Sequence, residues 1–545
     1  PLGIFYGLLG LYLFLSAINS KNKKIIISKI IFGGIIMGFG MSSWGGNQFF
    51  IIPIGLFILA LPFFRKDHKF LLWCIPLFVA IFLLVSSSFE RPGPNFVYGI
   101  GGLSLIIPTM FLVISIFVQK ISKNENKIRN NVILLFSIVL ITLFLLVATS
   151  ASDSLDLPSF RYLNAINPFL TTSVPIVDSV AEHATPNTQV SFFLHSILMI
   201  FAALAVWLLL SKKSSESKIF IKNDMKVFVL IFGITGVYVS STFMRLELFA
   251  SISLVVLSSI SLSILSKNFF MINTSTKKSI LFKISFVVLI LIFFITPLIF
   301  PSDYNWINGI DAPPVILNGA TMNPPSSDWK EALEWIKINT PENSVIASWW
   351  DYGYWIQTLG ERATLSDNST IHSNLIEDHA QMLLSTPDEG WKMLQKMNAD
   401  YIVTFISVQK TNAQLEGNQI HVLGGGGDES KVYWFASIAG LPIEKYVEAN
   451  DPSVKTNYLW NETLLGKMIP YTVVTYYDSQ NKKEANSYLP GFKDLSIKEI
   501  KYDFDDDGPL KLVYASPSFY DESITMKNCV FIYEINKNYV SPNNP

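Results

Sequence analysis

Residues 280–300 read ILFKISFVVLILIFFITPLIF, an almost wholly apolar run, and the chain changes character directly after it. A helix needs about 20 apolar residues to cross the hydrocarbon core of a bilayer, so this run predicts a membrane span. Beyond residue 300 the sequence has mixed charge and many Pro, Gly, Asn and Asp residues, which favour turns. The run therefore predicts the end of a membrane domain and the start of a water-exposed one.

Working toward the N-terminus, the same pattern recurs. Nine further apolar runs are found at 2–18, 27–41, 49–64, 69–88, 98–118, 131–149, 190–211, 226–241 and 247–265. We therefore expect a polytopic α-helical membrane domain of about ten helices over residues 1–300, followed by an external mixed α/β domain over 301–545. In the second region the apolar spacing predicts helices at 326–338 and 388–398 and strands at 400–406, 470–477 and 528–534.

Overall charge and cysteine usage bear on two further properties, the binding of nucleic acid and the presence of a disulfide. The formal net charge is −1, which gives no reason to expect a nucleic-acid partner. Cys74 lies in an apolar run and Cys529 in the water-exposed region, so we expect no disulfide between them.

Lysine and arginine indicate which loops face the cytoplasm, because short cytoplasmic loops are enriched in both. Alternate loops carry twenty of these residues, whereas the remaining loops carry only Arg91, Arg161 and Arg245. This imbalance predicts that the loop 150–190, Arg245 and the whole region after residue 300 are extracytoplasmic. A loop as long as 150–190 is more than a connector, since loops of that length are usually functional or disordered.

The external region contains Trp349-Trp350-Asp351-Tyr352-Gly353. An indole offers only an N–H donor and an ionised carboxylate only acceptor oxygens, so the three side chains could hold a small hydroxyl from both sides. This predicts a pocket that recognises a Ser or Thr side chain. The alternative is that both Trp are core residues and Asp351 caps a helix.

Together with three other segments, this motif resembles the catalytic subunit of oligosaccharyltransferase, with a single-chain archaeal type favoured. Trp349–Gly353 is similar to the WWDYG motif of that family. Ser179-Val180-Ala181-Glu182 resembles its SVSE/TIXE motif, and Met244-Arg245-Leu246 resembles its arginine at the outer end of a helix. Asp428-Glu429-Ser430-Lys431 resembles DxxK, and Ile438 matches the trailing MxxI element, in which Phe435 replaces Met.

The resemblance implies transfer of an oligosaccharide from a lipid-linked pyrophosphate donor to Asn of Asn-X-Ser/Thr sequons in acceptor polypeptides, with inversion at the anomeric carbon. Glu182 is the implied catalytic carboxylate, and Arg245 the implied partner of the lipid pyrophosphate. The implied binding residues for the sequon hydroxyl and methyl are Trp349, Trp350, Asp351, Asp428, Lys431 and Ile438. Each has a simpler alternative: an inert loop Glu for Glu182, an interface anchor for Arg245, and a surface ion pair for Asp428 with Lys431.

A divalent cation, Mn²⁺ or Mg²⁺, is implied as the Lewis acid for the pyrophosphate. The acidic metal ligands that the family carries toward its N-terminus have no counterpart here, and the sequence begins at Pro1 within a membrane run. We therefore expect the stretch to lack the front end of a longer protein, to hold no metal ligands of its own, and to be inactive by itself.

Three weaker features remain. His372 follows the Trp pair at a distance where bacterial relatives have an active-site histidine, although a structural His is an equal alternative. Asp503, Asp505 and Asp507 precede Gly508 like the front of a calcium loop, but position 12 is Tyr514, so a solvated turn is favoured over calcium. Sequons occur at Asn273, Asn368 and Asn461, of which we expect only the last two to be external.

Two other functions would require different sequence features. A different polytopic lipid-sugar transferase would lack the Trp-Trp-Asp pocket. A transporter with an external binding domain would need ionisable residues within several membrane helices, and these runs contain almost none.

Overall fold

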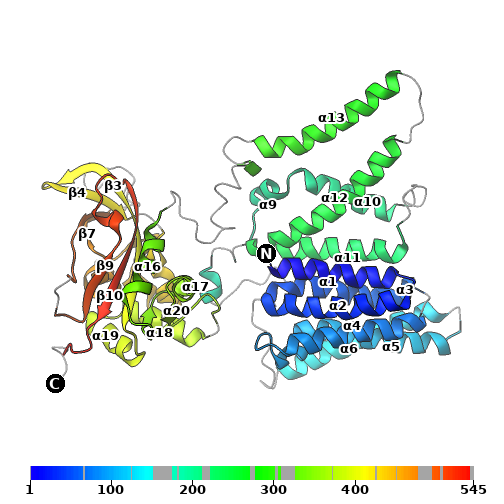
Figure 1. Ribbon diagram of the computed structural model, residues 1–545, viewed down its shortest axis with the longest axis horizontal. Helices are drawn as coiled ribbons and strands as arrows, with labels where there is room; N and C mark the ends of the chain where they lie inside the picture. Colours follow the sequence, from blue (N-terminus) through cyan, green and yellow to red (C-terminus); the bar gives the residue numbers. More distant parts are fainter. Residues whose placement is uncertain are drawn as a thin grey trace. The chain divides into compact units, whose positions relative to one another are not determined.

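The computed structural model describes residues 2–65, 68–123, 126–150, 175–180, 183, 185–211, 221–270, 277–300, 305–307, 326–370, 372–423, 426–449, 451–476, 494–503 and 507–540. The chain divides into two compact units. The membrane unit contains residues 1–173 and 180–319, and the α/β unit contains residues 174–179 and 320–545. Figure 1 shows the helical membrane unit in blue to green and the sheet-containing unit in green to red.

The membrane unit consists of helices that coincide with all ten apolar runs. They are α1 (Leu2–Asn19), α2 (Lys23–Ser43), α3 (Gln48–Phe64), α4 (His68–Ser87), α5 (Ile100–Ile121), α6 (Lys127–Ser150), α9 (Thr188–His195), α10 (Ile197–Leu210), α11 (Asn223–Ser240), α12 (Glu247–Phe270) and α13 (Lys277–Ile299). Eight spans among the described residues are long and apolar enough to cross a membrane. The prediction of a multi-pass helical domain is confirmed.

The apolar run 190–211 differs from the expectation of one continuous helix. It forms α9 and α10, which are separated at Ser196, where φ is 40°. A left-handed backbone conformation cannot continue a right-handed helix, so the run is interrupted there. Apolar composition alone does not reveal such a break.

Contacts between neighbouring helices hold the membrane unit together. Helix α1 packs on α2, α2 on α4, α3 on α5 and α11, and α12 on both α10 and α11. The buried side chains are mainly Phe, Ile and Leu. Helix α1 approaches α3 closely at Gly7, where an added Cβ would lie 2.3 Å from the Phe50 ring. Small residues permit this close packing in membranes, where helices gain little from excluding water.

The α/β unit is built on an eight-stranded mixed sheet. Its strands are β1 (Val345–Ala347), β2 (Ala363–Thr364), β3 (Tyr401–Leu415), β4 (Asn418–Leu423), β7 (Tyr471–Tyr476), β8 (Asp494–Lys498), β9 (Leu510–Ala515) and β10 (Met526–Ile535). The order is β2-β1-β3-β4-β8-β7, with β10 pairing to both β3 and β9. The β1–β2 and β1–β3 pairs are parallel and the others are antiparallel. Strands β5 (Val447–Glu448) and β6 (Asp451–Lys455) form a separate hairpin.

Helices lie beside this sheet (Figure 1). They are α8 (Pro175–Asp178), α16 (Asp328–Asn339), α17 (Gly353–Thr358), α18 (Ser373–Leu384), α19 (Pro387–Lys396), α20 (Val432–Ile438), α21 (Asn457–Glu462), α22 (Leu464–Met468) and α23 (Pro517–Tyr520). The five helices and strands expected here from the sequence all form, as α16, α19, β3, β7 and β10, so the mixed α/β prediction is confirmed. Cys74 and Cys529 are both buried.

One short helix of the α/β unit comes from the long loop 150–190. Helix α8 groups with residues 320–545 and packs on α20, and Val177 of α8 is buried. Burial of an apolar side chain favours this docking by excluding it from water. Part of the loop is therefore fixed on the helix that contains Ile438.

Candidate functional site

The motif Trp349–Gly353 directly follows β1, at the carboxyl end of the parallel part of the sheet. Trp350–Tyr352 form a 3₁₀ turn, η7, which leads into α17. Trp349 and Trp350 are only 3% and 7% exposed. Both indoles are therefore buried, as the alternative of two core residues predicts.

Aromatic packing accounts for that burial. The Trp349 ring centroid lies 4.4 Å from that of Phe435 on α20, and Tyr352 packs on Trp329 of α16 at 4.6 Å. Phe435, which stands where the resemblance would place a Met, is fully buried. The indole N–H of Trp350 is buried without a hydrogen-bond partner in the described part of the chain.

Asp351 caps no helix; its partner is a lysine 80 residues later. Lys431 Nζ donates to Asp351 Oδ2 at 2.7 Å. The same ammonium donates to the Tyr352 hydroxyl at 2.9 Å and lies 4.5 Å from the Tyr352 ring centroid. Lys431 ends the 3₁₀ turn η8 (Asp428–Lys431), so the two motifs form one network.

Both carboxylate oxygens of Asp428, at the start of η8, accept hydrogen bonds within this site. Its Oδ1 accepts from the Tyr352 hydroxyl at 2.7 Å, and its Oδ2 accepts from the Phe405 N–H at 2.9 Å and from Thr404 Oγ1 at 3.2 Å. The carboxyl side chain is 3% exposed and lies 3.9 Å from Lys431. Burial raises the pKa of Asp428, while Lys431 and the three donors oppose this effect. Asp428 and Lys431 therefore do not form a surface ion pair.

Glu429 was not singled out from the sequence, yet it is the least compensated acid of the site. It is 1% exposed, and neither carboxylate oxygen has a hydrogen-bond partner among the described residues. Burial raises the pKa of Glu429 to about 7, with partial opposition from the charge of Lys455. Its position inside the DxxK-like segment was the only available signal.

Asn368, one of the chain's own sequon residues, supports the motif directly. Its Nδ2 donates to the Asp351 carbonyl at 3.0 Å, and its Oδ1 accepts from the Tyr354 N–H at 3.2 Å. These two bonds connect the segment after β2 with η7 and α17. The side-chain amide therefore has a structural role in holding the Trp-Trp-Asp segment.

The two histidines of this region lie in different environments. His372 is exposed at the start of α18, without a side-chain capping bond. His379, seven residues later, is 1% exposed, and its ring centroid lies 6.5 Å from that of Trp349. Neither nitrogen of His379 has a hydrogen-bond partner among the described residues, and burial lowers its pKa to about 4. The histidine beside the Trp pair is thus His379.

In the membrane unit, Arg245 occupies the 3₁₀ turn η6 (Met244–Leu246) between α11 and α12. Its side chain is exposed. This placement at the end of a helix pair agrees with the sequence expectation. Glu182 lies outside the described residues, whereas the ring of its neighbour His183 packs at a tilt against Phe243 with the ring centroids 5.1 Å apart.

The described residues contain no group of three or more His, Cys, Asp or Glu side chains that could hold a metal ion. The Mn²⁺ or Mg²⁺ implied by the resemblance thus has no ligand set within them. Of the calcium-like segment, Asp505 lies outside the described residues, and Asp503 and Asp507 are exposed. Backbone bonds hold this turn, since the Asp503 carbonyl accepts from Leu512 and the Asp507 carbonyl from Asn536.

The helices and the sheet define a multi-pass membrane protein with a folded mixed α/β unit after its spans. Residues 342–423 match the model of the STT3/PglB/AglB core domain, a range that includes the Trp-Trp-Asp segment. The chain is therefore similar to the catalytic subunits of oligosaccharyltransferases.

Individual relatives agree with this family. The chain is 24% identical over 437 residues to the dolichyl-diphosphooligosaccharide–protein glycosyltransferase subunit STT3B of Oryza sativa subsp. japonica, covering 73% of this chain and 58% of that protein. It is 25% identical over 276 residues to subunit STT3 of Saccharomyces cerevisiae, covering 49% and 35%. The chain thus spans only part of the length of these relatives. A crystal structure of the Archaeoglobus fulgidus oligosaccharyltransferase with Zn and sulfate is similar with a TM-score of 0.49 and 15% identity, covering 74% of this chain and 48% of that one.

Proposed function

We propose that this protein provides the catalytic subunit of an oligosaccharyltransferase. It would transfer an oligosaccharide from a lipid-linked pyrophosphate to the Asn of Asn-X-Ser/Thr sequons in acceptor polypeptides. The observation that carries the proposal is the network in which Lys431 joins Asp351 and Tyr352 of one motif to Asp428 of the other. Two motifs far apart in sequence are thereby held as one rigid surface.

The α/β unit would recognise the sequon hydroxyl. A hydroxyl donates one hydrogen bond and accepts others, so it needs both an acceptor and a donor. Asp351 uses Oδ2 for Lys431, which leaves Oδ1 to accept, and Trp350 has a buried N–H without a partner in the described chain. A site with such groups discriminates against a side chain that lacks the hydroxyl, since its polar groups would stay unpaired. Ile438 would contact the methyl group of Thr.

The membrane unit would bind the donor and activate the acceptor amide. Arg245, exposed at the end of a helix pair, would hold the pyrophosphate through bidentate hydrogen bonds. A carboxamide nitrogen is a weak nucleophile because its lone pair is delocalised, and Glu182 would accept a hydrogen bond from its N–H. The lysine distribution supports an extracytoplasmic location for these groups and for the α/β unit.

The proposal includes inversion at the anomeric carbon and dependence on Mn²⁺ or Mg²⁺. A bound divalent cation would supply Lewis-acid neutralisation of the pyrophosphate. Because the described residues do not form a ligand set for it, no step is assigned to the ion.

The acceptor side is tested with the full-length protein in membranes and a lipid-linked oligosaccharide. Fluorescent peptides with Asn-X-Thr and with Ala at the +2 position are compared by a glycosylation mobility shift. We expect modification of the Thr peptide only. Equal modification of the Ala peptide would show that the hydroxyl pocket is not as proposed, and a different lipid-sugar transferase would modify neither.

The donor side is tested in the same assay with Arg245→Met and with a chelator. Loss of a bidentate phosphate partner is expected to raise the KM for the lipid donor about tenfold or more while the peptide KM stays unchanged. Chelation should abolish transfer, and Mn²⁺ or Mg²⁺ should restore it. Turnover that persists after chelation would contradict the cation dependence.

A further inference from the structure

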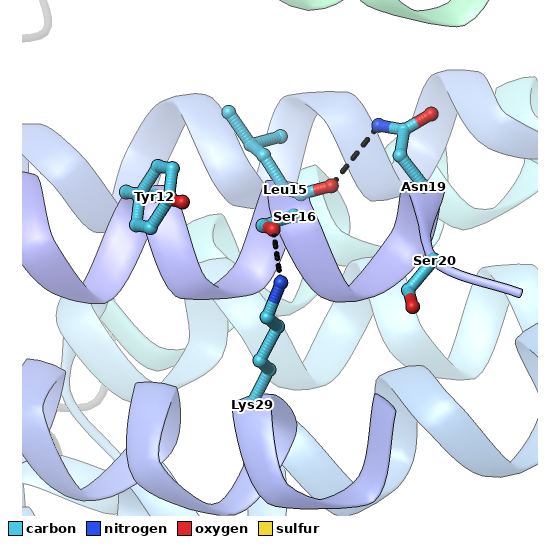
Figure 2. A pocket seen from close by; sticks show the side chains of 6 residues that line it. All are labelled: Tyr12, Leu15, Ser16, Asn19, Ser20 and Lys29. Atoms are coloured by element: carbon cyan, nitrogen blue, oxygen red, sulfur yellow. Dashed lines mark hydrogen bonds between the residues drawn. The ribbon is translucent and has the colours of Figure 1, made fainter. Parts of the chain in front are cut away.

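A polar groove lies between α1 and α2 in the membrane unit, far in sequence from every motif above. It has a volume of about 460 Å³ and is lined by Tyr12, Leu15, Ser16, Asn19, Ser20 and Lys29. Figure 2 shows Lys29 of α2 pointing to Ser16 of α1, with Tyr12 one turn along α1. Ionisable side chains such as that of Lys29 are rare within membrane-spanning helices and mark candidate functional sites.

The charge of Lys29 is not neutralised by the protein. Its Nζ donates to Ser16 Oγ at 2.6 Å, and no carboxylate of the described residues forms an ion pair with it. An ammonium has three N–H donors, so two are free for a ligand. By contrast, Arg65, which reaches the Ile18 carbonyl at the same end of α1, is paired with Asp224 at 3.3 Å.

The position of Lys29 along α2 indicates where in the bilayer a ligand of this groove would lie. Lys29 is the seventh residue of α2, so it lies about 9 Å along the helix axis from its start. That distance places a half-buried cation near the boundary between lipid headgroups and acyl chains. Lys21, Lys23 and Lys24 at the preceding turn are exposed and add positive charge to the rim.

We propose that this groove binds the phosphate of an anionic glycerophospholipid. The phosphate oxygens would accept from Lys29 Nζ and the hydroxyls of Ser20 and Tyr12. The acyl chains would lie along the exposed apolar side chains of α1 and α2, such as Leu8 and Phe32. A lipid rather than free phosphate is favoured because these flanking side chains are apolar and face the bilayer.

The test uses the full-length protein in nanodiscs of phosphatidylcholine with or without phosphatidylglycerol. Acylation of the Lys29 amine is followed by mass spectrometry, and retained phosphatidylglycerol is measured after detergent extraction. We expect protection of Lys29 by phosphatidylglycerol, and about fivefold less retained lipid in Lys29→Gln. The control Lys69→Gln removes an exposed lysine at the start of α4 and should change nothing.

Equal acylation in both nanodiscs, or equal retention in Lys29→Gln and Lys69→Gln, would overturn the proposal. Protection by inorganic phosphate to the same degree would also overturn it, because the ligand would then not be a lipid. The acylation measurement uses the unaltered protein, so it decides the matter even if Lys29→Gln does not fold.

A second observation lies at the opposite end of the membrane unit, beside Arg245. Glu247 in the first turn of α12 is 3% exposed, and its Oε2 lies 2.5 Å from Nε2 of His195, which ends α9. Its Oε1 accepts from Ser191 Oγ at 2.6 Å. Ser251 Oγ lies 3.4 Å from the other nitrogen of the His195 ring. Buried ionisable groups are costly unless they are paired in this way, so both ends of the pair are needed.

This pair fixes the end of the long loop to the turn that contains Arg245. Helix α9 directly follows the loop, and η6 directly precedes α12. The tilted ring contact between His183 and Phe243 adds a second attachment between the same two segments. We infer that His195 and Glu247 are positioning residues for Arg245, an inference that rests on the proposed function.

The test measures KM for the lipid donor, KM for the peptide and kcat in the full-length protein. Glu247→Ala is expected to raise the donor KM on the order of ten- to a hundredfold, because a displaced guanidinium no longer matches the phosphate. His195→Gln keeps a donor toward Glu247 and should restore most of the affinity relative to His195→Ala. The control Ser258→Ala removes the bond to the Leu198 carbonyl between α12 and α10 and should leave the donor KM unchanged.

A lack of transfer by the unaltered protein would refute the proposed function itself. Transfer by the unaltered protein together with equal donor KM values in Glu247→Ala and Ser258→Ala would refute only the positioning role. A loss of activity that follows loss of folded protein, with donor and peptide KM unchanged, would also refute it.

Discussion

The ammonium of Lys431 lies 2.7 Å from Oδ2 of Asp351, although 80 residues separate them in the sequence. The two side chains are 22% and 34% exposed, so water screens the pair only in part. Lys431 therefore determines the orientation of the carboxylate that the proposed function assigns to the sequon hydroxyl.

Replacement of Lys431 by Met is expected to free that carboxylate. The Kd of an Asn-X-Thr peptide should rise about tenfold, because a hydrogen bond between charged groups is lost. The stability loss should exceed the roughly 1 kcal/mol of a partly exposed pair, because Asp428, which is 3% exposed, also loses the cation 3.9 Å away. The control Lys337→Met breaks the more exposed pair with Glu361 and should affect neither quantity. An unchanged peptide Kd in Lys431→Met would show that the carboxylate of Asp351 does not bind the peptide in the orientation that Lys431 gives it.

Tyr352→Phe removes one hydroxyl from the centre of the network. Asp428 loses a donor at 2.7 Å while remaining buried, and Lys431 loses an acceptor. We expect a destabilisation of about 1–3 kcal/mol, the cost of a buried polar group that loses a partner. Thermal unfolding of the full-length protein measures it. Tyr354→Phe, at a residue that is 44% exposed, serves as the control, and equal Tm values for the two variants would contradict the role of the hydroxyl.

The sequence predicted which segments meet at the site, but not how they meet. The two motifs were assigned to one pocket, and Lys431 does join them. The link through Tyr352 and Asp428 spans 76 residues, and no spacing rule predicts a contact of that range. The same applies to Asn368, whose sequon gave no sign that its side chain holds the backbone of the motif.

The histidine could have been predicted better. In α18, the buried residues Ile376, His379, Ala380 and Leu383 recur at helical spacing. This periodicity places His379 on the inner face and leaves His372 before the first turn. The break at Ser196, in contrast, gives no such signal, because the apolar run continues on both sides of it.

His379→Leu is expected to stabilise the protein, since the ring is buried with both nitrogens unpaired among the described residues. The pKa of His379 is lowered to about 4 from 6.5, so the unfolded state binds more protons between these values. Stability therefore falls as the pH falls through this range, and the variant should lose that dependence. Measurement of Tm against pH tests this. If the Tm of the variant falls toward low pH as steeply as the Tm of the unaltered protein, His379 does not stay neutral in the folded state.

Glu429→Gln is expected to change the stability of the protein at neutral and higher pH. The pKa of Glu429 is raised from 4.5 to about 7, so the folded state binds more protons than the unfolded state between these values. Stability then falls as the pH rises through this window and levels off above it. Relative to the unaltered protein, the variant should therefore be up to about 3 kcal/mol more stable above pH 7 than it is near pH 4.5. A parallel pH dependence in both proteins would show that Glu429 is ionised throughout.

The chain's own sequons are expected to stay unmodified once the α/β unit has folded. The Asn368 amide is held between the Asp351 carbonyl and the Tyr354 N–H. For Asn461, the hydroxyl of Thr463 at the +2 position is buried, donating to the Leu459 carbonyl at 2.6 Å and accepting from Gly466 at 3.1 Å. Transfer to either Asn would require these bonds to open first.

Mass spectrometry of tryptic peptides from the membrane-extracted protein tests this, with synthetic peptides that contain the same two sequons as controls. The free peptides should be modified by an active oligosaccharyltransferase, because their Asn and Thr side chains are unrestrained. A glycan on Asn368 in protein that still binds an Asn-X-Thr peptide would contradict the structural role of that side chain, since the Trp-Trp-Asp segment would then hold without its two hydrogen bonds.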